Sequence, residues 1–238
     1  MEPSVLDEFD RLEPDVVVIV GDENSVSANV AAQVAPFAGQ VVRLGGADRF
    51  ETSQLIAEYA FDSAETAYIA TGYNFPDALT AGAAAGADAS PLLLTHGTRP
   101  SDGLLDTLNG LGVDGVYIAG DGLAVAISQE DVYEANGIEV LDRYAGVNRF
   151  DTGVLVSQAS FDGPAARVYV GTGQRFPDAL AGSAIAGAQG VPVFVSPSYC
   201  MWPDVLGEVD RLSGPQIVLL GDQNALDNNV FDLVECTN

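Results

Sequence analysis

The sequence contains no lysine. Its 238 residues include nine Arg, one His and 34 Asp or Glu, which leaves a formal net charge of −25 and a pI near 4.1. Contacts with phosphates usually dominate the affinity of proteins for DNA and RNA, and a chain of this charge is repelled by them. The composition therefore excludes nucleic acid as an unassisted partner.

Long apolar runs are also missing. A membrane-spanning helix needs about 20 predominantly apolar residues, whereas the longest uncharged apolar stretch, 78–87, is mainly alanine and glycine. We therefore predict no transmembrane segment. The start of the chain, 1–3, has neither a basic residue nor an apolar segment, so we expect that any export signal has been removed or was never present.

Cysteine is scarce too, with only Cys200 and Cys236. Two cysteines are too few for a disulfide framework, yet an even count is compatible with a single bridge in an exported protein. Two unpaired buried thiols would leave the same sequence. Both alternatives stay open.

An internal repeat organises the rest of the chain. The segment RLGGADRFET at 43–52 returns as RYAGVNRFDT at 143–152, and TGYNFPDAL at 71–79 returns as TGQRFPDAL at 172–180. An apolar run that closes on Gly-Asp occurs three times, ending at Asp22, Asp121 and Asp222. The repeats predict two whole units, 41–138 and 139–238, preceded in 1–40 by the C-terminal portion of another.

Each unit alternates short apolar runs with helical patterns. The runs at 68–70, 91–94 and 116–118 are continuous, as in parallel strands that are buried on both faces, and the leucines of 104–111 form a helical stripe. Single strands that alternate with single helices favour right-handed crossovers. The pattern therefore predicts an α/β fold of layered lobes with mainly parallel sheets.

The motifs resemble the cell wall-binding repeat, type 2. That repeat opens on Arg-x-x-Gly-x-x-Arg-aromatic-x-Thr and continues with Thr-Gly-x-x-Phe-Pro-Asp-Ala-Leu, a Pro-led apolar strand and a closing Gly-Asp, as this chain does over about 16–238. The resemblance implies tandem Rossmann/toprim-like three-layer lobes and an extracellular location at the cell wall or cell surface. It further implies a non-catalytic module that holds exported proteins on a prokaryotic envelope, often by binding an anionic wall polymer. Members usually carry three tandem repeats around a pseudo-threefold axis, whereas this chain has two full units and the end of another.

Two arginines of the repeat, Arg49 and Arg149, stand where a cation is unfavourable. Each follows a good N-cap residue and so falls at the first helical position, where a positive charge opposes the helix dipole. A compensating partner is therefore expected. It is either a salt bridge within the chain, to Asp77 or Asp178, or a phosphate or carboxylate of a ligand.

The acidic residues of the repeat have structural interpretations. Asp77 and Asp178 follow prolines suited to the first helical position, where their carboxylates neutralise the helix N-terminus and compete with an incoming phosphate. Asp22, Asp121 and Asp222 follow a strand-ending glycine and fit a tight turn. The alternative for these three is a ligand groove at the carboxyl ends of the strands.

Residues suited to catalysis are few. His96 is the only histidine and its counterpart in the second unit is Pro197, so a repeated Ser-His-Asp or metal site cannot be assembled. We predict no enzyme and no cofactor, and the sequence selects no metal ligands. A Rossmann-like nucleotide-sugar binder or enzyme is one alternative, with the Gly-Asp carboxylates on ribose or metal, and an architectural subunit of a surface array is another. Repetition favours tethering, because multivalent polymer binding gains effective concentration from each copy.

The charge of the chain constrains how it could hold an anionic polymer. A module with a net charge of −25 repels such a polymer unless arginines line a groove or Ca²⁺ bridges its carboxylates to polymer phosphates. We predict polymer binding by residues at the motif positions, namely Arg43, Arg49, Arg143, Arg149, Arg175, Thr71, Asn74 and Thr172.

The leading segment, 1–40, contains an apolar strand pattern at 16–20 that has to be covered. We expect it to pack in cis on the first lobe. Weak self-association, or packing against another part of the parent protein, is the secondary expectation.

Overall fold

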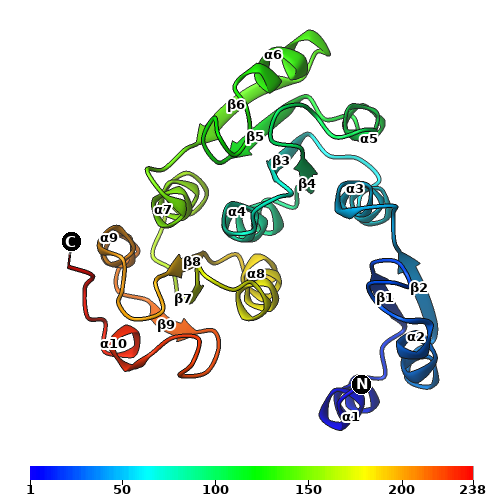
Figure 1. Cartoon of the computed structure of the whole chain (residues 1–238), viewed down its shortest axis with the longest axis horizontal. Helices are drawn as coiled ribbons and strands as arrows, with labels where there is room; N and C mark the ends of the chain where they lie inside the picture. Colours follow the sequence, from blue (N-terminus) through cyan, green and yellow to red (C-terminus); the bar gives the residue numbers. More distant parts are fainter. Residues whose placement is uncertain (238) are drawn as a thin grey trace.

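The computed structural model describes residues 1–237 as an α/β protein in which every paired strand is parallel to its neighbour (Figure 1). Its strands form three sheets. The predicted fold class is confirmed. No helix within the described residues is long and apolar enough to span a bilayer.

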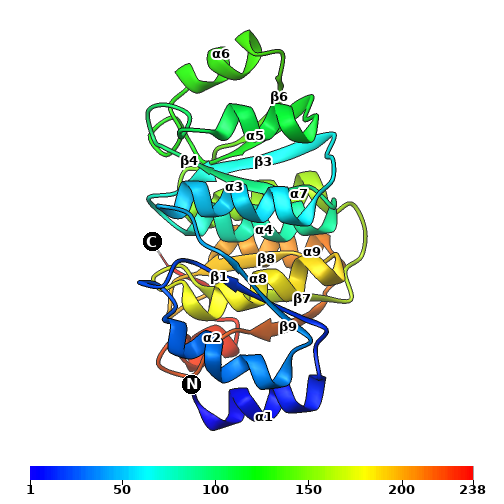
Figure 2. The same ribbon diagram turned by 90° about the vertical axis from the view of Figure 1, so that its right-hand side faces the viewer.

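The N-terminal part forms the smallest sheet, and its first helix lies at one end of the molecule (Figure 2). Strand β1 pairs with β2 over its whole length, from Val16 opposite Gln40 to Val20 opposite Leu44. The elements are α1 (Pro3–Leu12), β1 (Val16–Val20), α2 (Ala28–Val34), the short 3-10 helix Ala35–Phe37 and β2 (Gln40–Leu44).

The first lobe is built on a four-stranded sheet with the order β4-β3-β5-β6. Its central strands are buried, as their continuous apolar sequences predict. The elements are α3 (Arg49–Ala60), β3 (Thr66–Thr71), α4 (Pro76–Ala87), β4 (Leu92–Thr95), α5 (Leu104–Leu111), β5 (Gly115–Ala119), α6 (Ser128–Ala135) and β6 (Glu139–Tyr144).

The second lobe repeats this arrangement with three strands in the order β8-β7-β9. A disulfide joins Cys200 to Cys236 and fastens the end of the described chain to the loop after β8. The elements are α7 (Arg149–Ser160), β7 (Arg167–Thr172), α8 (Pro177–Gln189), β8 (Val193–Ser196), α9 (Pro203–Arg211), β9 (Gln216–Leu219) and α10 (Asn228–Phe231).

The sheets cross the boundaries between the sequence units. Strand β6 lies in the second unit, 139–238, yet it pairs with β5 of the first unit. Likewise β1 pairs with β2, but within residues 1–237 it joins no strand of the four-stranded sheet. Each unit therefore contributes its opening strand to the sheet of the unit before it, and the leading segment contacts the first unit through that strand.

Two helices rich in small residues hold the lobes together. Helices α4 and α8 pack against each other, α4 on the sheet of the first lobe and α8 on the sheet of the second (Figure 1). A Cβ atom added to Gly86 would lie 3.0 Å from the Cα of Gly187, and Ser183 Oγ donates a hydrogen bond of 2.7 Å to the Leu79 carbonyl. The alanine and glycine stretch of α4 is therefore a packing surface.

Apolar surface remains on β1 and on α8. The Val20 side chain is 51% exposed, whereas Ala119 at the matching position of β5 is fully buried by its neighbours. Leu180 on α8 is 55% exposed, whereas its counterpart Leu79 on α4 is 3% exposed. The leading strand is thus paired in cis but only partly covered.

Candidate functional site

A cavity of about 340 Å³ lies where the first unit meets the second. It opens at the carboxyl ends of β3, β5 and β6, beside the N-termini of α4 and α7, which is where open α/β sheets usually bind ligands. Its lining residues are Thr71, Tyr73, Asn74, Asp77, Gly97, Asp121, Leu123, Ala124, Gly146, Val147, Asn148, Arg149 and Thr152.

The first turn of α7 forms one wall of this junction cavity. The Asn148 side chain caps the helix, because its Oδ1 accepts hydrogen bonds from the backbone N–H groups of Phe150 and Asp151 at 2.8 and 3.1 Å. Arg149 follows at the first helical position and donates from Nη1 to the Gly173 carbonyl at 2.7 Å. The start of α7 is therefore tied to the loop after β7.

Arg49 is held in the same way in the first unit. Its Nη1 donates to the Gly72 carbonyl at 2.7 Å, and Asp48 caps the helix that it opens. Within residues 1–237 neither Arg49 nor Arg149 lies within 4.0 Å of a carboxylate oxygen. The expected salt bridge to Asp77 or Asp178 is therefore wrong, because backbone carbonyls supply the compensating negative dipole.

Asp77 forms the acidic floor of the junction cavity. Its Oδ2 approaches Gly120 so closely that an added Cβ there would lie 3.0 Å away. Burial raises the pKa of Asp77 from 3.8 to about 6, because the nearby Arg149 only partly offsets it and Asp121 opposes ionisation further. Asp178 at the matching position of the second lobe is exposed.

The carboxylates of the Gly-Asp elements bind their own turns. Asp121 Oδ1 accepts from the backbone N–H groups of Leu123 and Ala124, both at 2.9 Å, and Asp222 accepts from Asn224 in the same manner. Asp22 accepts from the Ser25 N–H at 2.8 Å. The turn interpretation therefore describes all three, and Asp121 also lines the cavity.

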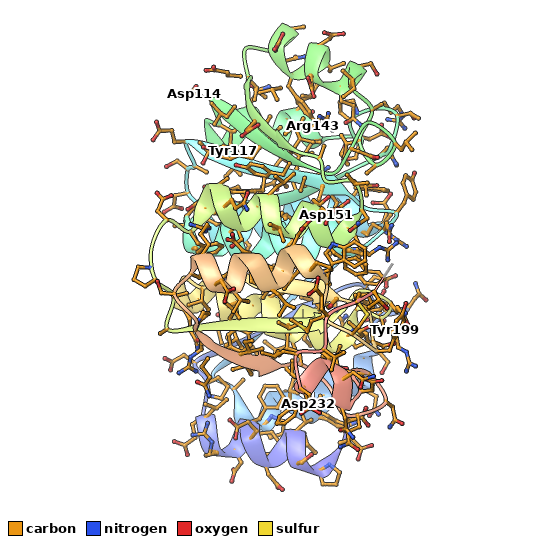
Figure 3. The ribbon with its side chains drawn as sticks, turned by 90° about the vertical axis from the view of Figure 1, so that its left-hand side faces the viewer. Asp114, Tyr117, Arg143, Asp151, Tyr199 and Asp232 are labelled. Atoms are coloured by element: carbon orange, nitrogen blue, oxygen red, sulfur yellow. A yellow bond between two sulfur atoms is a disulfide. The ribbon has the colours of Figure 1, made fainter. Side chains whose placement is uncertain are left out.

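Arg43 and Arg143 occupy matching positions in the repeat and make matching hydrogen bonds. Arg43 Nη1 donates to the Gly21 carbonyl and Arg143 Nη1 to the Gly120 carbonyl, at 2.7 and 2.8 Å. Arg143, on β6 (Figure 3), also forms an ion pair of 2.6 Å with Glu130. These two guanidinium groups fasten each closing turn to the strand that follows.

The structure brings together only part of the predicted polymer-binding set. Thr71, Asn74 and Arg149 line the junction cavity, whereas Arg43, Arg49 and Arg143 do not. Thr172 and Arg175 lie at the corresponding end of the second lobe, where Arg175 lowers the pKa of Asp222 as a minor effect beside the hydrogen bonds from Asn224 and Ala225.

The sequence motifs did not predict the residues at the rim of the cavity. Tyr73, Leu123 and Val147 are 66%, 92% and 98% exposed, and all three line it. They stand at positions where the two units differ, since Gln174 replaces Tyr73 and Asn224 replaces Leu123. A residue-by-residue comparison of the units would have identified them.

The comparisons with known proteins concern the same repeated segments. A family model described as "Cell wall binding domain 2 (CWB2)" matches residues 43–130 and 143–231. The chain belongs to this cell wall binding family. Its junction cavity is thus formed between two cell wall binding domains, and the resemblance of the repeat motifs is confirmed.

Individual relatives agree with this assignment. The N-acetylmuramoyl-L-alanine amidase LytC of Bacillus subtilis (strain 168) is 26% identical over 170 residues, which is 71% of this chain and 33% of LytC. Among solved structures, Cwp6 and Cwp8 from Clostridium difficile share the fold, with TM-scores of 0.86 and 0.77 at 23% and 24% identity. They align with 98% and 94% of this chain, which spans about 38% of the length of each.

Proposed function

We propose that this chain is a non-catalytic module that holds an exported protein on the cell wall by binding an anionic wall polymer. Support comes from the family of both domains and from the place of the cavity. The first domain contributes Thr71 and Asp77, and the second contributes Asn148 and Arg149. Because two repeats build one cavity, each further junction in an array adds a contact to the same polymer, which raises its effective concentration.

Arginines outside the cavity fit a polymer whose negative charges are spaced apart from one another. The exposed arginines Arg49 and Arg175 lie at the carboxyl ends of the strands, at separate positions along that edge. Close contacts with guanidinium groups offset the repulsion from a chain of net charge −25. No group of three or more His, Cys, Asp or Glu side chains in residues 1–237 is arranged to hold a metal. A bridging Ca²⁺ would therefore take part of its ligands from the polymer.

A sedimentation assay with purified cell walls tests this function. We expect the full chain to sediment with the walls and the Arg49→Ala/Arg149→Ala double variant to bind several-fold more weakly than either single variant. Arg11→Ala removes the same charge from α1, where Arg11 pairs with Glu8 at the surface, and should bind like the parent chain.

The assay has a second arm with a chelator, in which a loss of binding would assign the bridging role to divalent cations. Thermal melts accompany each variant, because both arginines also hold a carbonyl. Failure of the parent chain to bind walls would contradict the proposed function. Full binding by a folded double variant would show that these two arginines do not contact the polymer.

A further inference from the structure

An aromatic platform stands beside the junction cavity. The Tyr73 ring is stacked with His96 at 5.8 Å between ring centroids, and its Oη is hydrogen-bonded to His96 Nδ1 at 2.7 Å. His96 in turn packs on Phe50 at 4.1 Å. The Tyr73 ring also meets the buried Phe50 ring edge-on, at 5.6 Å between centroids. The exposed Tyr73 ring is therefore held in place by two aromatic neighbours. The second unit has Gln174 and Pro197 at the two leading positions and lacks the platform.

Two apolar side chains border the same cavity. Leu123 and Val147 are almost fully exposed and both line the cavity. The matching positions hold Asn24 and Asn224 for Leu123, and Ala47 for Val147. The apolar border therefore belongs to this junction and is not a requirement of the repeat.

The floor of the cavity disfavours an anionic group. Asp77 and Asp121 offer carboxylate oxygens, and Asn74 adds an amide. The lining includes one guanidinium, that of Arg149, and this group already donates to the Gly173 carbonyl. Carboxylates accept hydrogen bonds from hydroxyl groups and repel phosphates, so these groups suit a ligand rich in hydroxyls.

We propose that the junction cavity binds an uncharged N-acetylhexosamine residue of the wall polymer, whose negative charges stay outside the cavity; this assignment rests on the proposed binding of a wall polymer. The apolar face of the sugar ring lies on Tyr73, and its hydroxyl groups donate to Asp77 and Asp121. The acetamido methyl group packs against Leu123 and Val147. A volume of about 340 Å³ is at the lower end for ligand pockets, about 300–1,000 Å³, which suits a single sugar residue better than a polymer segment.

The test is a titration of the full chain with tri-N-acetylchitotriose, followed by two-dimensional NMR, with a short poly(glycerol phosphate) as the anionic probe. We expect the chitotriose to bind and to shift the resonances of 71–77 and 121–124, and the phosphate polymer to leave them unchanged. Tyr73→Ala should weaken chitotriose binding at least tenfold, whereas Tyr73→Phe, which keeps the ring, should retain most of it.

Matched controls come from the repeat itself. Leu123→Asn gives the first junction the side chain of its counterparts and should weaken binding several-fold, whereas Gln174→Ala in the second unit should have no effect. Chitotriose that does not bind, Tyr73→Ala that binds like the parent chain, or phosphate polymer that competes for the cavity would each overturn the sugar assignment.

The two proposals fail in different ways. Walls that sediment with the chain while chitotriose does not bind would leave the anchoring function standing and remove this sugar from the cavity. Chitotriose that binds to a chain with no affinity for walls would contradict the anchoring function instead.

Discussion

At the residue scale, Asp77 is a carboxyl group that burial makes harder to ionise. Its pKa is 3.8 in an unfolded chain and about 6 in the folded one, so between these values the folded chain keeps a proton that the unfolded chain has lost. Stability therefore falls as the pH rises from about 3.8 to about 6 and levels off above that. Ionisation of this one carboxyl costs on the order of 3 kcal/mol above that pH, and nothing below both pKa values.

Replacement of Asp77 by Asn should remove that cost. We expect Asp77→Asn to raise the melting temperature at pH 7.5, by roughly 2–4 °C for each kcal/mol regained. The gain should shrink to about a third at pH 4.5, where the folded carboxyl is already protonated. Calorimetry at the two pH values measures the difference.

Asp178→Asn is the matched control, since Asp178 occupies the same position in the repeat and is exposed. It should change the melting temperature much less. A gain for Asp77→Asn that is equal at both pH values would contradict the assignment of a buried, pH-dependent carboxyl.

The residues also show what a sequence can reveal about a site. Thr71, Asn74 and Arg149 were predicted from the repeat and do line the cavity. The partner of Arg149 was not predicted, because it is a backbone carbonyl and carbonyls have no signature in a sequence. Tyr73 was missed for another reason: it differs between the units, and in these two loops Asn74 and Arg175 were the differing residues that were predicted.

At the element scale, the small residues of α4 and α8 set how closely the lobes approach. Gly86 and Gly187 meet backbone to backbone, so neither tolerates a side chain without movement of the other helix. Strands and helices themselves were predictable because each repeats its pattern. The transfer of β6 to the sheet of the preceding unit was not, because pairing between distant strands depends on tertiary packing.

Two glycine substitutions distinguish the effect of close packing on stability from the effect of helix propensity. Gly86→Ala should lower the free energy of unfolding by about 1–3 kcal/mol, because its Cβ would press on Gly187. Gly110→Ala, near the end of α5, meets nothing within 4 Å and should stabilise by up to about 1 kcal/mol. Denaturant unfolding of both variants makes the comparison. A Gly86→Ala variant as stable as Gly110→Ala would show that the two lobes are not closely packed there.

At the scale of the whole molecule, the site belongs to neither repeat alone. The cavity needs the strand ends of the first lobe and the first turn of α7, which begins the helical part of the next unit. Apolar side chains of β1 and α8, such as Val20 and Leu180, are exposed at the surface. We propose weak self-association through these surfaces as a secondary property.

Hydrogen exchange of the full chain with and without purified wall polymer shows whether the binding site lies between the repeats. We expect protection in three segments that are far apart in sequence, 71–77, 121–124 and 146–152, because together they enclose the cavity. Protection confined to one unit, or to the surface of α1 and α2, would contradict a binding site between the repeats.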